Sequence, residues 1–233
     1  MRAWPLTHMT NALLPALQIE TAPSPKASVI WMHGLGADGD DFVPIVQELD
    51  LSSAPGIRFI FPHSPMQPVT INGGYVMRAW YDIAGSDLSR SEDGAGIRRS
   101  QKQIERLIAR ERELGIEPSR IVLAGFSQGG AIALQTGLRH PEKLAGIIAL
   151  SCYLPLAATV AAEAHRANAQ IPIFMAHGVQ DGVIPLFLAK ASRAHLARLG
   201  YSVEWHEYLM PHSVCMEEIE DIGAFLTRIL STT

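Results

Sequence analysis

The sequence contains little cysteine, with only Cys152 and Cys215 among its 233 residues. Two cysteines cannot form the framework of several disulfides that holds small secreted proteins together. A chain of this length buries roughly 70% of its unfolded surface and needs no such cross-links. A single bridge between the two cysteines stays open, although two free buried thiols are the favoured interpretation.

A surplus of positive charge is also absent. The chain has 19 lysines and arginines against 23 acidic residues, which gives a net charge of −4. Nucleic-acid-binding proteins neutralise phosphates with a basic surface, so we do not expect nucleic acid as a partner. The arginines between residues 98 and 112 alternate with glutamates, which is typical of the solvent-exposed face of a helix.

Long apolar runs are missing as well. A membrane-spanning helix needs about 20 consecutive apolar residues, and no segment approaches that length. The first 20 residues carry an early arginine, but His8, Asn11 and Pro15 interrupt any apolar core, so they do not predict a secretory signal. We therefore expect a cytoplasmic protein without stable membrane insertion.

What the sequence does contain is an alternation of short apolar runs with longer segments of helical periodicity. The hydrophobic content of 48% suits one folded domain over residues 1–233. The pattern predicts a mostly parallel α/β sheet with helices on both faces. Strands are predicted at 17–20, 28–32, 57–61, 120–124, 146–150, 171–176 and 202–208, and helices at 41–49, 96–114, 128–139, 186–199 and 214–230.

Residues 63–94 fit neither periodicity. This stretch is rich in Pro, Gly, Ser and Asp. Long irregular segments inside a compact domain usually serve a site, so we expect 63–94 to be a lid-like segment beside an active site. Apolar side chains around residues 64–80 would also suit a weak homodimer.

The sharpest local motif is Gly-Phe-Ser-Gln-Gly at residues 125–129, which matches G-x-S-x-G. It lies between a predicted strand and a predicted helix, as a nucleophile elbow requires. Serine on such a turn needs neighbours without side chains, because the backbone is strained and tightly packed. The motif predicts the α/β-hydrolase fold with Ser127 as the nucleophile of a serine hydrolase.

An acid and a base should follow Ser127 in that order in this fold. Asp181 comes directly after the strand predicted at 171–176, and His212 lies in the loop between the last strand and the last helix. These two positions meet the carboxyl edge of a parallel sheet, so we expect Asp181 to orient His212 and His212 to activate Ser127. His63, His177 and His206 are weaker candidates for the base because of their position in the chain.

The glycine-rich loop after the strand at 28–32 permits two interpretations. Gly34, Gly36 and Gly39 match the G-x-G-x-x-G of a dinucleotide-binding loop. That site expects an acid at the end of the next strand, where Pro62 and His63 stand instead. The favoured interpretation is an oxyanion hole made by the backbone N–H groups of Leu35 and Gln128.

Six motifs in order extend the evidence over nearly the whole chain: HGLGADGDDF (33–42), NGGYVMRAWYDI (72–83), GFSQGGAIAL (125–134), LSCYLP (150–155), HGVQDGVIP (177–185) and MPHSV (210–214). With these motifs the sequence resembles the acyl-protein thioesterase and carboxylesterase family, also called phospholipase/carboxylesterase. The resemblance implies a triad of Ser127, Asp181 and His212. It also implies Leu35 and Gln128 amides as the oxyanion hole, and an acyl-binding groove without metal or cofactor.

The sequence departs from the family pattern in the loop at residues 61–65, at Tyr153, where some relatives carry tryptophan, and at Gly182, where proline is frequent. Met77, Tyr153 and Val183, together with Leu35, are predicted to lie near the acyl group.

The expected reaction is hydrolysis of carboxylic esters or thioesters through an acyl-enzyme. Long-chain acyl-protein thioesterase or lysophospholipase activity is the alternative, and a nucleotide-dependent reductase or a non-catalytic module of this fold are distant ones.

Overall fold

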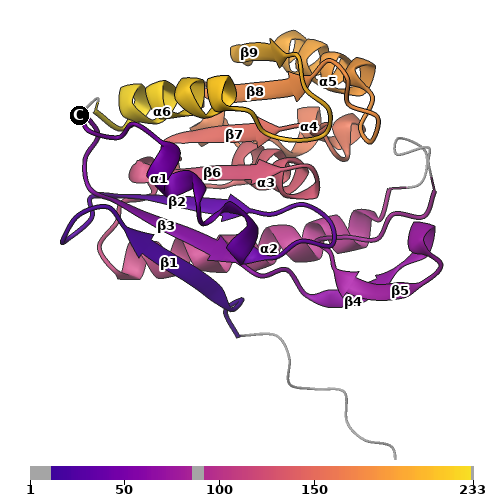
Figure 1. Cartoon of the computed structure of the whole chain (residues 1–233), viewed down its shortest axis with the longest axis horizontal. Coiled ribbons are helices and arrows are strands. Elements are labelled where there is room, and N and C mark those ends of the chain that lie inside the picture. The colour runs from indigo at the N-terminus through magenta and orange to yellow at the C-terminus, as the bar shows by residue number, and fades with distance from the viewer. Residues whose placement is uncertain (1–11, 86–91, 232–233) are drawn as a thin grey trace, which may run out of the picture.

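The computed structural model describes residues 12–85 and 92–231. A seven-stranded sheet in the order β1-β3-β2-β6-β7-β8-β9 forms the centre (Figure 1). Its members are β1 (Ala16–Glu20), β2 (Ala27–Met32), β3 (Ile57–Pro62), β6 (Ile121–Phe126), β7 (Gly146–Leu150), β8 (Ile173–Gly178) and β9 (Val203–Tyr208). Every neighbouring pair is parallel except β1 and β3, which confirms the predicted mostly parallel sheet.

The central strands are buried on both faces, as their apolar sequences predict. In β2, Ile30 and Met32 contribute to one hydrophobic cluster, while Val29 and Trp31 contribute to another on the opposite face. Alternate side chains of a strand point to opposite faces, so a run of apolar residues fills both clusters. The carboxyl edge of this buried sheet carries the loops that follow β2, β6, β8 and β9.

Helices cover both faces of the sheet (Figure 1). Side chains of α1 (Ile45–Glu48) and α6 (Met216–Ser231) belong to the cluster on one face. The other cluster takes side chains from α2 (Gly94–Glu113), α3 (Gln128–Arg139), α4 (Ala157–Glu163) and α5 (Leu186–Arg198). Every residue of α3 is buried, which explains its small and apolar sequence. No helix in the described ranges has the length and apolarity to cross a bilayer.

Three parts of the chain differ from the elements predicted above. The helix expected at 41–49 is split into a 3₁₀ turn, η1 (Gly39–Phe42), and α1, because Pro44 lies between them. The segment 63–94 contains a hairpin of β4 (Met66–Val69) and β5 (Tyr75–Arg78) joined through η2 (Thr70–Asn72), and residues 86–91 of it lie outside the described residues. Helix α4 was not predicted.

Both cysteines are free, with Cys152 buried and Cys215 only half-buried.

The carboxyl group of Glu218, in the first turn of α6, is fully buried. Burial raises its pKa from 4.5 to about 8. A backbone hydrogen bond from Cys215 lowers the pKa of Glu218, but by less than burial raises it. The folded protein therefore keeps this acid protonated at neutral pH, whereas the unfolded chain ionises it.

A Glu218→Gln variant tests this assignment. Because the pKa of the folded state is higher, the stability of the wild type should fall as pH rises from about 4.5 to about 8. Glutamine does not ionise, so the variant should lose less stability over this range. Urea unfolding at pH 5 and pH 8 measures the difference, with Glu220→Gln on the exposed surface as control. An equal pH dependence in wild type and E218Q would contradict the assignment.

Candidate active site

Ser127 occupies the sharp turn between β6 and α3. Its backbone angles are φ 54° and ψ −119°, a conformation that is strained for a residue with a side chain. Its N–H donates to the carbonyl of Leu150 at 2.9 Å, which ties the turn to the neighbouring strand β7. A Cβ atom at Gly125 would overlap the backbone of Gly129, and one at Gly129 would overlap the carbonyl of Met32. Both glycines of the motif are therefore required by close backbone packing.

Asp181 and His212 are joined directly. His212 Nδ1 donates to Asp181 Oδ2 at 2.7 Å. The other carboxylate oxygen, Oδ1, accepts the N–H groups of Val183 and Ile184, each at 2.8 Å. The Asp181 side chain is fully buried. A carboxylate fixed by two backbone donors holds the imidazole in one orientation with its proton on Nδ1.

The loops that carry these two residues are also bonded to each other. Val179 N–H donates to the carbonyl of Tyr208 at 2.9 Å, and Gln180 N–H donates to the carbonyl of Met210 at 3.1 Å. A Cβ at Gly178 would overlap the carbonyls of Met210 and Pro211. The adjacent parallel strands β8 and β9 thus deliver the acid and the histidine to the same edge.

Ser127 and His212 line one cavity of about 540 Å³ at the carboxyl edge of the sheet. The ring of Phe126 packs against His212, with 4.6 Å between centroids. The wall is mostly apolar, as is usual for sites that hold small organic groups. The full lining is Gly34, Leu35, Ala37, Asp41, Ile71, Asn72, Tyr81, Ile83, Phe126, Ser127, Gln128, Tyr153, Val183, Ile184 and His212.

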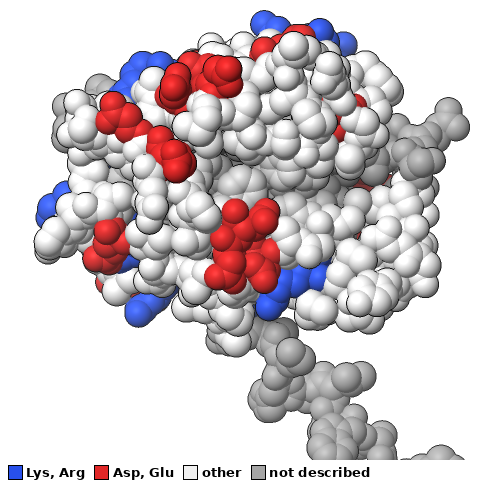
Figure 2. Space-filling model, viewed as in Figure 1, with Lys and Arg blue, Asp and Glu red and all other residues white. Residues whose placement is uncertain are grey.

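One part of the cavity rim is acidic. Figure 2 shows acidic side chains gathered in a patch over η1, whose first turn contains Asp40 and Asp41. Asp41 is exposed and belongs to the cavity lining. Carboxylates at the rim disfavour an anionic group on this side of the entrance.

The loop that follows β2 approaches the serine closely. A Cβ at Gly34 would lie 3.6 Å from Ser127 Cβ, and Gly36 has a positive φ of 78°. Gly36 N–H donates to the carbonyl of Arg78 at 2.9 Å, which fixes the far side of the loop. Leu35, between these glycines, lines the cavity. The sequence predicted this proximity from the glycines at 34 and 36.

His33 secures the start of the same loop. Its Nδ1 donates to the carbonyl of Gly34 at 2.7 Å, and its Nε2 accepts the N–H of Ser64 at 3.1 Å. Burial lowers the pKa of His33, so the ring is neutral with its proton on Nδ1. The ring therefore links the glycine loop to the segment that follows β3.

The side chain of Gln128 has a function that the sequence argument missed, because only its backbone amide was considered. Its Oε1 accepts the N–H of Trp80 at 3.0 Å, and its Nε2 donates to the carbonyl of Tyr81 at 2.9 Å. Trp80 Nε1 in turn donates to the carbonyl of His33 at 2.9 Å. One buried amide thus binds the elbow to the segment after β5.

The predicted substrate-contacting residues are not all in the cavity wall. Tyr153 and Val183 belong to it, whereas Met77 does not. The Met77 sulfur accepts the side-chain amide of Asn72 at 3.4 Å and lies close to Gly36, so it supports the wall from behind. Tyr81 and Phe126 were not predicted as lining residues. Tyr81 lies within the motif at residues 72–83 and Phe126 within the motif at 125–129, and this was the only sequence signal for their location.

The weaker histidine candidates make other contacts. His177 Nε2 donates to the carbonyl of Ile184 at 2.8 Å, and burial lowers the pKa of its ring. It therefore stabilises the loop of Asp181, as its position beside the acid suggests. His206 lies within β9 and stacks on Phe174, with 4.8 Å between ring centroids.

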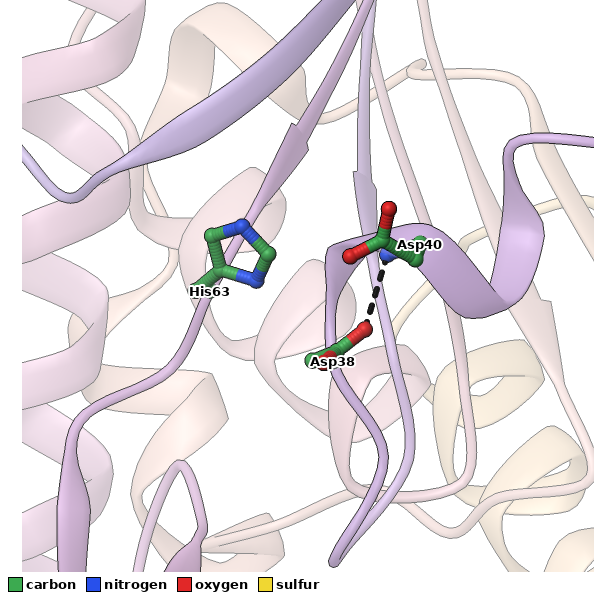
Figure 3. Close-up of side chains that lie close together, drawn as sticks. All are labelled: Asp38, Asp40 and His63. Atoms are coloured by element: carbon green, nitrogen blue, oxygen red, sulfur yellow. Dashed lines mark hydrogen bonds between the residues drawn. The ribbon is translucent and has the colours of Figure 1, made fainter.

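Asp38, Asp40 and His63 lie close together beside η1 (Figure 3). Asp38 Oδ1 accepts the N–H of Asp40 at 2.9 Å, and His63 Nδ1 accepts the N–H of Gly39 at 3.0 Å. Because Nδ1 accepts this hydrogen bond, it is not free to bind an ion. These contacts explain the group as a support for the turn into η1.

The architecture is that of an α/β-hydrolase with Ser127 on the strand-to-helix turn between β6 and α3, and solved structures share this fold. Arabidopsis thaliana SOBER1 has a TM-score of 0.82 at 28% identity and covers 88% of this chain and 99% of its own. Zea mays acyl-protein thioesterase 2 has a TM-score of 0.79 at 29% identity and covers 92% of this chain and 99% of its own.

Sequence comparison specifies the class further. Residues 16–230 match the model of the Phospholipase/Carboxylesterase family, so the chain belongs to that family of ester hydrolases. Acyl-protein thioesterase 1 of Gibberella zeae is 40% identical over 95% of this chain and 98% of its own. The Neurospora crassa protein of the same name is 42% identical over 93% and 92%. Membership in a family of ester hydrolases argues against the nucleotide-dependent reductase that Gly34, Gly36 and Gly39 also allowed.

A Gln128→Met variant tests the importance of the buried amide. Methionine has a similar volume, but it leaves the N–H of Trp80 and the carbonyl of Tyr81 without partners. Two buried unsatisfied groups should lower the free energy of unfolding by about 2 to 4 kcal/mol. Gln135→Met, in the same helix, removes one side-chain hydrogen bond and should cost about 1 kcal/mol. Equal losses in the two variants, measured by urea unfolding, would contradict this interpretation.

Proposed function

We propose that this hydrolase works through an acyl-enzyme formed on Ser127, with His212 as general base and Asp181 as its orienting acid. The observation that carries the proposal is the Asp181–His212 hydrogen bond of 2.7 Å, on a ring that shares one cavity with the serine. Asp181 holds the proton of the ring on Nδ1, so Nε2 is the nitrogen left to accept a proton.

The reaction then proceeds in two steps. Ser127 Oγ bonds to the carbonyl carbon of the substrate while its proton passes to His212 Nε2. When the tetrahedral intermediate collapses, the bond to the leaving group breaks and Nε2 returns the proton to the departing oxygen or sulfur. Water repeats the sequence on the acyl-enzyme, releases the carboxylic acid and restores Ser127.

The developing oxyanion needs donors that are in place before the reaction begins. We assign them to the N–H groups of Leu35 and Gln128. Gln128 is the first residue of α3, where N–H groups have no acceptor within the helix and the helix dipole is positive. Leu35 is held between two glycines in the loop beside Ser127. Donors fixed by packing stabilise the transition state without reorganisation.

The mostly apolar wall favours an acyl group as the part of the substrate that the cavity holds. Relatives named acyl-protein thioesterase 1 support thioesters as well as oxygen esters, because the same proton transfer serves either leaving group. Tyr153 and Val183 are the proposed contacts to the acyl group. Met77 remains a prediction, as does the weak homodimer through the exposed side chains of the β4–β5 hairpin.

Removing the nucleophile tests the assignment most simply. Ser127→Ala should lower kcat for a p-nitrophenyl ester by about 10⁴-fold or more, since no other group can form the acyl-enzyme. Asp181→Asn should lower it by a similar order, because an amide can favour the wrong tautomer of His212. The exposed Asp50→Asn serves as a control with unchanged kcat. Turnover of Ser127→Ala at the wild-type rate would refute the proposal.

An acyl-chain series tests what the cavity holds. With p-nitrophenyl esters of increasing length, kcat/KM should rise by up to about fourfold for each buried methylene, since burial contributes about 0.8 kcal/mol. Matched oxygen and sulfur esters of one acyl group should both be hydrolysed. A profile independent of chain length in the wild type would show that the acyl group does not lie against this wall.

A further inference from the structure

Two phenol groups meet at the wall of the active-site cavity. The hydroxyl oxygens of Tyr81, which follows β5, and Tyr153, which follows β7, lie 3.1 Å apart. Both residues line the cavity that contains Ser127. Tyr81 is only 2% exposed, whereas Tyr153 is half-buried. Tyr153 is therefore the more accessible residue of the pair.

The two phenols have two O–H groups, and the hydrogen bond between them uses only one. Two hydroxyls that share a single hydrogen bond use one hydrogen and leave the other free. No other hydrogen-bond partner of either phenol is present in residues 12–85 and 92–231. Burial raises the pKa of both phenols, to about 12 for Tyr153, so both hydroxyls keep their protons at neutral pH.

The carboxylate whose charge acts on both phenols has a hydrogen-bond partner of its own. Glu92 raises the pKa of both phenols through its charge, but its Oε1 accepts the N–H of Leu156 at 2.9 Å. Either phenol can donate in this hydrogen bond, and when the Tyr81 O–H donates to the Tyr153 oxygen, the Tyr153 O–H is left for another acceptor. In that arrangement the hydroxyl has no acceptor among the described residues of the mostly apolar wall.

An all-carbon acyl chain would cover this donor without satisfying it. Ile71, Ile83 and Val183 give such a chain apolar contacts elsewhere in the wall, but an unpaired buried O–H is unfavourable. A chain with an oxygen at the matching position would keep the same contacts and accept the hydrogen bond. A site with an unsatisfied polar group discriminates against ligands that lack the complementary group.

We propose that the Tyr153 hydroxyl, oriented by Tyr81, selects acyl chains that carry an oxygen acceptor, such as an ether, oxo or hydroxyl oxygen, over all-carbon chains. This rests on the proposed function, in which the cavity holds the acyl group of the substrate. The two tyrosines act on specificity and take no part in bond making.

The test compares p-nitrophenyl octanoate with analogues in which oxygen replaces one methylene at a time from C4 to C7. The measured quantity is the ratio of kcat/KM for each oxygen analogue to that for octanoate. At one chain position, Tyr153→Phe should lower this ratio by about three- to tenfold relative to wild type, as expected for one hydrogen bond. Tyr81→Phe should lower it less, because the Tyr153 donor remains.

Tyr201→Phe is the matched control, because it changes a buried tyrosine outside the cavity and should leave the ratio unchanged. Melting temperatures check that the variants fold. A ratio that is the same in wild type, Y81F and Y153F at every position would overturn the proposal.

A second measurement separates this inference from the proposed function. Hydrolysis of octanoate by wild type, with its loss in Ser127→Ala, supports the function whatever the oxygen analogues show. If no ester is hydrolysed, the function fails, and calorimetric binding of octanoic acid and its oxygen analogues still tests the phenol pair. Tighter binding of one analogue to wild type than to Y153F supports the inference, and equal binding to both proteins overturns it.

Discussion

The hydrogen bond between Asp181 and His212 is the interaction on which the site depends. Two backbone N–H groups fix the carboxylate, and the carboxylate fixes the imidazole. Because the acid is buried and its loop is bonded to the loop of the histidine, the pair behaves as one rigid unit. A ring held in this way has one nitrogen left for chemistry, and that ring borders the cavity of Ser127.

The parallel sheet explains why these residues lie at one edge of the molecule's core. Its strands β6, β8 and β9 end at one edge, and the loops that follow them carry the serine, the acid and the histidine. Close packing sets the remaining geometry, since Gly129 lets the elbow approach the end of strand β2 and Gly125 lets it approach the start of α3, with no side chain in between. The Gln128 amide then links the elbow to the segment after β5, so the glycine loop, the elbow and the cavity wall form a connected framework.

Much of this could be predicted from the sequence, because strands, elbow and chain order are local signals. The strand at 146–150 and the helix at 128–139 have the predicted bounds, and the acid and histidine follow the strands as expected. The β4–β5 hairpin could not be predicted, because residues 66–78 lack a clear period. The Gln128 side chain and the Tyr81–Tyr153 pair depend on contacts 47 and 72 residues apart, which no local pattern encodes.

The central claim is that a covalent acyl group is carried by the serine at the elbow. The most direct test is to mix the protein with a p-nitrophenyl ester, quench with acid within the first turnover, and locate the added mass by peptide mass spectrometry. The account predicts one acyl group on the peptide that contains Ser127, at a level that rises and then falls as substrate is consumed. An acyl group found on a different residue, or rapid turnover with no acylated protein at any time, would contradict it.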